Sequence, residues 1–367
     1  MLSSRDDIVP WLRLTLVPGL SPAAQRRLLK AFGSPHAVLA ATAHDISVAA
    51  EDASVAPLLE KGPRKGLLEA TLAWREADGC NLITLADAQY PKALLEIHDP
   101  PAVLYVRGRI EMLNVPAFAI VGSRNATAQG LRDAEAFALA LSEAGLAIVS
   151  GLALGIDASA HRGGIAGAGS SIAVVGTGAD RIYPRRNREL AHALAEKGCL
   201  ISEFPLGTPP DTWNFPRRNR LISGLARGVL VVEAGLPSGT LTTARCAVEQ
   251  GRDVFCVPGS IHSPLSKGCH WLIKEGAKLV ESADDVLEEL GLGRRRSPRE
   301  DTPREGEKRD PLLDAMGFAP ISIDQMAERT GLGADKLAAQ LSRLEIEGCV
   351  AALAGGWFQR TPAPVIE

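Results

Sequence analysis

Long apolar runs, paired cysteines and aromatic side chains are all scarce in this chain of 367 residues. No apolar stretch approaches the ~20 residues that a membrane-spanning helix needs, and no basic segment followed by an apolar core resembles a secretory signal. We therefore expect a cytoplasmic protein with no membrane contact. Hydrophobic residues form 46% of the chain and charged residues 23%, which indicates folded domains rather than a disordered polymer.

The cysteines and histidines do not form the patterns of a disulfide framework or a metal site. No C-x-x-C pair occurs, and most cysteines lie in apolar segments, which favours buried, reduced thiols. The seven histidines form no H-E-x-x-H motif and no close pair, so we expect neither a metal nor a cofactor. The six cysteines are Cys80, Cys199, Cys246, Cys256, Cys269 and Cys349.

The formal net charge of −3 conceals a strongly uneven distribution along the chain. The stretch Thr212–Val232 contains four arginines and no acidic residue, whereas Glu281–Glu289 is strongly acidic. Local patches rather than the overall charge should therefore decide the binding partners. The length predicts two or three domains.

The first 80 residues form the first predicted domain, which is helical. Residues 9–40 have apolar spacing of helical period, interrupted by the turn Val17–Leu20. This pattern resembles a helix-hairpin-helix, whose turn amides can hold a phosphate as helix N-termini do. The alternative is a small helical domain with an ordinary glycine turn. We favour it because Arg26, Arg27 and Lys30 are the only basic residues nearby.

The second predicted domain, residues 85–290, has the sequence pattern of a parallel sheet covered by helices on both faces. Short runs rich in Val and Ile alternate with helix-length connections, which is typical of a doubly wound, Rossmann-like α/β domain. Val103–Val106 supplies one more strand that extends this sheet. The core strand segments read AFAIVGSR, LAIVSG, IAVVGTG, CLISEF, GVLVVEA and DVFCVPG.

Two further regions follow the sheet domain. Residues 291–310 hold many charges and almost no apolar residue, which predicts a flexible linker. Residues 311–367 have the outline of a winged helix, with turns at Gly331–Gly333 and Gly355–Gly356.

The reading helix expected in this winged helix carries more acidic than basic residues. Such a helix suits a phosphate-lined groove poorly, so we expect protein contact or weak accessory DNA contact rather than a sequence-specific repressor. Its charged residues are Lys336 and Arg343 against Asp335, Glu345 and Glu347.

Unusual loops follow the strands of the predicted sheet, at the edge where open parallel sheets bind ligands. Neither GTGADR nor GSRNAT completes the G-x-G-x-x-G fingerprint of a dinucleotide site. Several loops nevertheless carry arginines, among them Arg124, Arg181, Arg185 and Arg186. An edge with this charge predicts a site for a long anion rather than for a single phosphate.

The segment FPRRNR, residues 215–220, adds an aromatic ring to this charge. Rings that stack on bases, combined with guanidinium contacts to phosphates, are the working parts of single-strand nucleic-acid binding. Phe215 and Trp213 are the candidates for stacking. The alternative is that Phe215 belongs to the core and anchors a packed loop, with the arginines solvated.

The motifs over residues 89–280 resemble, in the same order, those of the DNA-processing protein family DprA, also called Smf. They are YPKALLEIHDPPAVLYVRG, VGSRNAT, SGLALGIDASAH, GTGADRIYP, SEFPLG, FPRRNRLISGL, EAGLPSGTLTTA, VFCVPG and GCHWLIKEGA. The resemblance implies an extended Rossmann fold between an N-terminal sterile-alpha-motif-type domain and a C-terminal winged helix. It also implies a homodimer that binds single-stranded DNA and loads the RecA recombinase during natural transformation.

The resemblance also assigns DNA-binding positions in this sequence. Arg124 occupies the family's Gly-Ser-Arg position, and Arg185 stands where relatives carry a lysine, which keeps the charge but changes its geometry. The expected DNA-binding residues are Gly122, Ser123, Arg124, Arg185, Arg186, Phe215, Arg217, Arg218, Asn219, Arg220, Ser238, Gly239 and Thr240.

The main alternative is an enzyme, a phosphoribohydrolase of the lysine-decarboxylase-like class. Those proteins carry a phosphate loop followed closely by a catalytic glutamate, but here threonines follow Ser238–Thr240 and Glu249 lies further along. A phosphate cradle without this acid has no evident general base, so we expect no catalytic residue. Asp157 and His161 share a helix face and could act as an acid–base pair, but we expect them to hydrogen-bond their loop instead.

Overall fold

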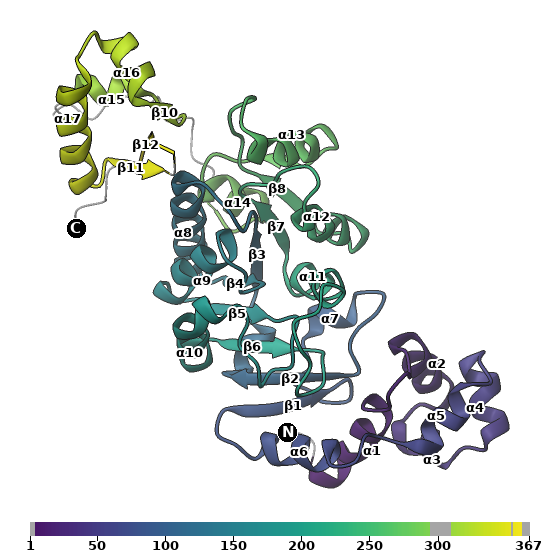
Figure 1. The fold of residues 1–367 in the computed structure, drawn as a ribbon. Coiled ribbons are helices and arrows are strands. Elements are labelled where there is room, and N and C mark those ends of the chain that lie inside the picture. The colour runs from purple at the N-terminus through teal and green to yellow at the C-terminus, as the bar shows by residue number, and fades with distance from the viewer. Residues whose placement is uncertain (1–3, 294–309, 354, 362–367) are drawn as a thin grey trace.

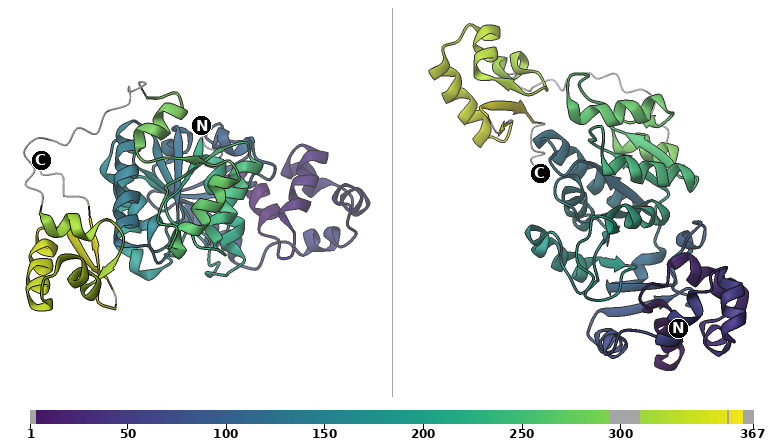
Figure 2. Two further views of the ribbon diagram at one scale, coloured as in Figure 1. Left: turned by 90° about the horizontal axis from the view of Figure 1, so that it is seen from above. Right: turned by 45° about the vertical axis from the view of Figure 1, so that its right-hand side comes forward.

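The structure is a computed structural model that describes residues 4–293, 310–353 and 355–361. Most of the segment expected to be a linker, residues 294–309, lies outside the described residues. Figure 1 shows a central sheet domain, with the N-terminal helices at one end and the C-terminal domain at the other, and Figure 2 shows the same order from two further directions. None of the helices within the described ranges is long and apolar enough to cross a membrane.

The N-terminal region is helical, as predicted. Serine or threonine side chains cap the first four helices by accepting a backbone N–H of the first turn, which satisfies a donor that has no partner within the helix. Gly19 has a φ of +83° and allows the turn between the first two helices. The helices are α1 (Arg5–Thr15), α2 (Pro22–Phe32), α3 (Pro35–Ala40), α4 (Ala43–Ala50), α5 (Val55–Lys61) and α6 (Leu67–Arg75).

The central domain contains a nine-stranded sheet in the order β1-β2-β6-β5-β4-β3-β7-β8-β9. β1 and β2 pair antiparallel, β2 also pairs antiparallel with β6, and all other neighbours are parallel. The predicted parallel sheet is confirmed. Its strands are β1 (Cys80–Thr84), β2 (Val103–Gly108), β3 (Ala117–Val121), β4 (Ala147–Ser150), β5 (Ser171–Val174), β6 (Cys199–Ser202), β7 (Gly228–Val231), β8 (Asp253–Cys256) and β9 (Lys278–Leu279).

Strand β2 includes the predicted strand Val103–Val106 and continues to Gly108. Strand β1 begins at Cys80, the last residue of the expected helical domain 1–80, and ends just before the expected sheet domain 85–290. Its pairing with β2 makes it part of the sheet. All six cysteines are free thiols, and four of them are buried.

Helices cover both faces of the sheet, so the strands between them are buried on both sides (Figure 1). One face carries α8 (Ala128–Glu143), α9 (Ile156–Ala166), α10 (Arg188–Lys197) and α14 (Ala283–Glu289). The other face carries α7 (Lys92–Leu95), α11 (Asn214–Leu225), α12 (Gly239–Glu249) and α13 (Lys267–Lys274).

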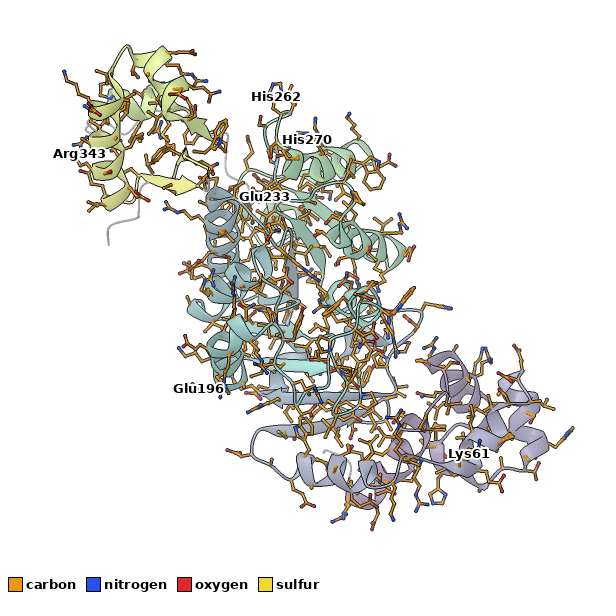
Figure 3. The ribbon with its side chains drawn as sticks, viewed as in Figure 1. Lys61, Glu196, Glu233, His262, His270 and Arg343 are labelled. Carbon is orange, nitrogen blue, oxygen red and sulfur yellow. The ribbon has the colours of Figure 1, made fainter. Side chains whose placement is uncertain are left out.

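The C-terminal domain is the predicted winged helix. Its three strands pair in the order β10-β12-β11 beside a small apolar core. Arg343, on the outer side of this domain in Figure 3, contacts Asp310 at 2.6 Å and Glu347 at 3.8 Å, so part of the positive charge of α17 is neutralised. The elements are α15 (Pro311–Met316), β10 (Ile321–Ser322), α16 (Ile323–Thr330), α17 (Ala334–Ile346), β11 (Val350–Leu353) and β12 (Trp357–Arg360).

Candidate functional site

The sheet has its topological switch point at β3. The chain passes from β3 to β4 on one side, whereas β7 pairs with β3 on the other side. Loops that leave β3 and β7 therefore diverge, and such a crevice at the carboxyl ends of strands is where open α/β sheets bind ligands. A groove of about 650 Å³ lies here, lined by residues that include Gly122, Ser123, Arg124, Ala153, Asp157, Tyr183, Phe215, Arg218, Asn219, Ser238, Gly239 and Thr240.

The loop after β3 is held in place by Glu233, which follows the neighbouring strand β7. The N–H of Ser123 donates to the carbonyl of Glu233 at 2.8 Å. The Glu233 carboxylate, labelled in Figure 3, lies beside the N-terminal end of α8 and accepts the N–H and the hydroxyl of Thr127 at 2.9 and 2.6 Å. Burial raises the pKa of Glu233. These bonds fix the loop from both sides and leave Arg124 exposed at the groove.

Phe215 lies in the first turn of α11 and not in a loop, which corrects the expectation for the FPRRNR segment. Pro216 fits there because the first turn of a helix leaves its backbone N–H groups unbonded in any case. The Phe215 ring packs on Gly176, where an added Cβ would come within 2.8 Å of the ring. The ring is only half-buried, so it is anchored on one side and open to the groove on the other.

Cations and a second ring surround Phe215. The guanidinium carbons of Arg124 and Arg218 lie 5.4 and 5.9 Å from the centre of its ring. The ring of Tyr183 lies 5.9 Å away, at an interplanar angle of 33°. The sequence analysis did not single out Tyr183, although its place directly before a proline and two arginines in a strand-end loop could have drawn attention to it.

Arg218 was expected to contact DNA directly, but the structure places it inside the protein, only 4% exposed. Its guanidinium donates to the carbonyls of Gly151, at 2.6 Å, and of Val174. Gly151 makes room for it, because an added Cβ would lie 2.6 Å from the guanidinium. Burial lowers the pKa of Arg218 to about 10, so it remains a cation at neutral pH.

Asp157 and His161 hydrogen-bond the loop after β4, as predicted. The Asp157 carboxylate accepts the N–H groups of Gly151 and Ala153 at 3.2 and 3.3 Å, and burial raises its pKa. His161 Nε2 accepts the N–H of Leu152 at 3.2 Å. The ring proton therefore resides on Nδ1, which lies 2.7 Å from the hydroxyl of Ser171. This pair therefore holds the loop in place.

The loop after β7 brings Ser238, Gly239 and Thr240 to the groove at the start of α12. Ser238 caps this helix by accepting the N–H of Thr240 at 3.2 Å. The Asn219 side-chain amide donates to the carbonyl of Gly239 at 3.2 Å and joins α11 to this loop. The helix N-terminus adds positive potential to the groove wall.

Four expected binding residues do not line the groove. Arg185 and Arg186 are exposed on a short 3₁₀ turn beyond Tyr183, and neither forms an ion pair with any described residue. Arg217 and Arg220 extend from the other side of α11 and pair with Glu203 at 3.0 and 2.5 Å. Trp213, the second candidate for stacking, is 83% exposed just before α11.

With the groove defined, comparison with known proteins identifies the family. Residues 81–291 match the family described as DNA recombination-mediator protein A, and residues 296–356 match the DprA winged helix domain. The chain belongs to the DNA recombination-mediator protein A family. The resemblance inferred from the sequence motifs is therefore confirmed.

Curated members of the family align with much of the chain. The Smf protein of Escherichia coli (strain K12) is 44% identical over 308 residues, which cover 81% of this chain and 82% of that protein. The DNA processing protein DprA of Streptococcus pneumoniae (strain ATCC BAA-255 / R6) is 47% identical over 207 residues, which cover 56% of this chain and 73% of that protein.

Solved structures of family members share the fold. DprA from Streptococcus pneumoniae superposes with a TM-score of 0.68 at 36% identity, covering 79% of this chain and 99% of that chain. DNA processing protein A from Helicobacter pylori superposes with a TM-score of 0.52 at 30% identity, covering 57% of this chain and 95% of that chain.

The buried His161 should make the fold sensitive to acid. Burial lowers its pKa from 6.5 to about 3 in the folded chain, whereas unfolding restores the ordinary value. Between these values the unfolded chain binds the extra proton, so stability is full above pH 6.5 and falls as the pH drops. From pH 7 to pH 5, the free energy of unfolding should fall by about 2 kcal/mol more in the wild type than in His161→Gln.

Urea unfolding of both proteins at the two pH values measures this difference. Asp157 is present in both proteins, so its own titration cancels in the comparison. An equal loss of stability in wild type and variant would contradict the neutral, buried state assigned to His161.

Proposed function

We propose that the groove at the switch point binds single-stranded DNA without sequence preference. The observation that carries the proposal is the half-buried Phe215 ring, flanked by the guanidinium of Arg124 inside a groove whose walls are strand-end loops. Any base offers a face for stacking and any phosphate offers a negative charge, so this combination suits a strand of any sequence. The groove, with a volume of about 650 Å³, is also too large for a single phosphate.

The relatives support this ligand. The Helicobacter pylori protein is described as having a unique single-stranded DNA binding mode, and the family is described as a recombination mediator. On this basis we propose that the chain protects incoming single strands and loads the RecA recombinase on them during DNA uptake.

A mediator of this kind must hold DNA and later release it, which favours several modest contacts over one tight site. Two subunits that act together provide such contacts, because the second binding event becomes intramolecular once the first has occurred. We therefore propose a homodimer, formed through the sheet domain, as the active species.

The alternative function, nucleotide hydrolysis, finds less support in the groove. Asp157 is the only carboxylate lining it within the described residues, and its Oδ2 already accepts two backbone N–H groups. Glu233, the acid that follows β7, is bonded to Thr127. A hydrolase needs a general base within reach of its substrate, so we propose binding without catalysis.

Removing the groove's exposed cation or its ring should weaken binding in different ways. Arg124→Ala should lower affinity and reduce the slope of log affinity against log salt by about 1, because one phosphate contact is lost. Phe215→Leu keeps an apolar group on Gly176 but removes stacking, so affinity should fall about tenfold with an unchanged salt slope. Fluorescence anisotropy with a labelled oligo-dT at several salt concentrations measures both effects.

Lys61→Ala is the control for charge, since Lys61 lies on a helix far from the groove (Figure 3). It should bind as the wild type does. Wild-type affinity in both Arg124→Ala and Phe215→Leu would place the DNA elsewhere.

A chain that ends at Gly293 should remain dimeric and retain most single-strand binding. The winged helix adds little to the attraction for DNA, because Arg343 of α17 is paired with Asp310 and Glu347. Sedimentation and a gel-shift titration of the shortened chain test this. A monomer with full affinity would show that pairing plays no part in binding, and a tenfold loss of affinity in a dimer would assign a DNA contact to the winged helix.

A further inference from the structure

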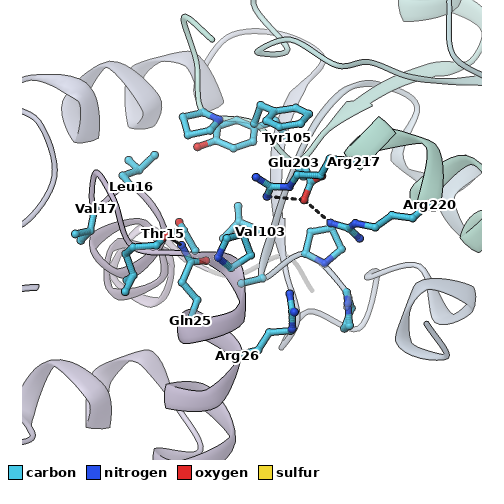
Figure 4. A pocket seen from close by; sticks show the side chains of 17 residues that line it. Thr15, Leu16, Val17, Gln25, Arg26, Val103, Tyr105, Glu203, Arg217 and Arg220 are labelled. Carbon is cyan, nitrogen blue, oxygen red and sulfur yellow. Dashed lines mark hydrogen bonds and ion pairs between the residues drawn. The ribbon is translucent and has the colours of Figure 1, made fainter. Parts of the chain in front are cut away.

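Helix α11 presents its arginines on two sides, and only one side belongs to the groove. Phe215, Arg218 and Asn219, spaced three and four positions apart, line the groove at the switch point. Arg217 and Arg220, also three apart, line a different pocket, which Figure 4 shows. The proposed DNA site therefore leaves two of the three FPRRNR arginines, Arg217 and Arg220, without a role.

This second pocket lies where the N-terminal helices meet the sheet domain. Thr15, the turn between α1 and α2, and Arg26 form one wall, and Glu203 with the two arginines of α11 forms the other (Figure 4). Its volume is about 220 Å³. Its apolar lining includes Leu16, Val17, Leu20, Pro100, Pro101 and Phe204.

Glu203 carries a buried acceptor that no described residue satisfies. Its side chain is 2% exposed, and its Oε2 accepts from Arg217 at 3.0 Å and from Arg220 at 2.5 Å. Its Oε1 is buried and has no hydrogen-bond partner among the described residues. A buried carboxylate oxygen without a donor is costly, so this position favours a ligand that brings an N–H group.

The charges around the pocket leave room for an anion. Three guanidiniums, those of Arg26, Arg217 and Arg220, face the carboxylates of Glu203 and Asp99. Arg26 forms no ion pair with any described residue, and burial lowers its pKa. A ligand that matches the pocket therefore combines a hydrogen-bond donor with a negative charge.

We propose that this pocket binds one nucleotide whose base bears an amino group, with the amino group donating to Glu203 Oε1 and the phosphate near Arg26. The pocket is smaller than the ~300–1,000 Å³ of sites for drug-sized ligands, so it holds a single base with the phosphate at its mouth. Cytosine suits it, because its N4 amino group donates to carboxylates. Thymine has no amino group, and its N3–H lies between two carbonyl oxygens that repel a carboxylate.

The nucleotide can belong to a strand or be free in solution. Phe215 and Arg217 lie two positions apart on α11, so a strand that crosses the start of this helix passes from the groove to the pocket. If the nucleotide is part of a strand, the inference rests on the proposed function. Both sources supply the same chemistry, and the experiment separates them.

Fluorescence anisotropy of the full chain with labelled dC15 and dT15 at pH 7.5 is the test for a strand. Stacking on Phe215 does not distinguish the two bases, so a preference reports on the pocket. We expect dC15 to bind about five- to tenfold more tightly, through one charge-assisted hydrogen bond. Thr15→Phe, which fills the pocket from the half-buried end of α1, should remove the preference and leave dT15 affinity unchanged.

Arg26→Ala, as a second variant, should weaken dC15 binding and reduce its salt slope by about 1. Arg13→Ala removes an exposed cation of α1 and should behave as the wild type.

Calorimetric titration of the full chain with dCMP and with dTMP tests binding of a free nucleotide. Binding of dCMP that exceeds dTMP binding and is lost in Thr15→Phe supports the pocket with a free nucleotide, even if neither oligonucleotide binds and the proposed function fails. A dC15 preference without dCMP binding supports a nucleotide of the strand. If wild type shows no dC15 preference and no dCMP binding, or if every preference persists in Thr15→Phe, the inference is overturned.

Discussion

The guanidinium of Arg218 holds the site together from inside. It donates to the backbone carbonyls of Gly151 and Val174, which join the ends of two neighbouring strands, β4 and β5, to helix α11. A buried cation is costly unless its charge and its donors find partners, and here the Asp157 carboxylate and these carbonyls provide them. Because these hydrogen bonds require a defined geometry, they fix the position of α11 on the sheet. The Phe215 ring is thereby held against Gly176.

This arrangement explains how a chain with almost no net charge presents so much positive charge at one helix. The arginines of FPRRNR have separate environments: Arg218 stabilises the loops from within, whereas Arg217 and Arg220 share the carboxylate of Glu203 on another side of the helix. The exposed cation beside the ring is Arg124, which comes from a different loop. The groove therefore depends on distant segments that only the folded sheet brings together.

The fold of the sheet domain could be predicted from the sequence, for physical reasons. Strands buried on both faces predicted the parallel sheet. Loops rich in glycine and arginine led us to expect a binding site at the edge where the carboxyl ends of these strands meet. The sequence analysis did not predict the helix that begins at Asn214, because a proline such as Pro216 is also typical of loops. On a helix, Arg217 and Arg220 share one side because they are three positions apart, and that side faces away from the groove. Without the helix this separation could not be recognised. The burial of Arg218 depends on Gly151, 67 residues away, and no local pattern reveals such a contact.

The central claim is that a single strand lies in the groove against Phe215. Photocrosslinking of an oligonucleotide substituted with 5-iodouracil, followed by mass mapping of the linked peptide, tests it most directly. The account predicts crosslinks to Phe215 or Tyr183, whose rings lie 5.9 Å apart at the groove. Crosslinks found only in the N-terminal helices or in the winged helix would contradict it.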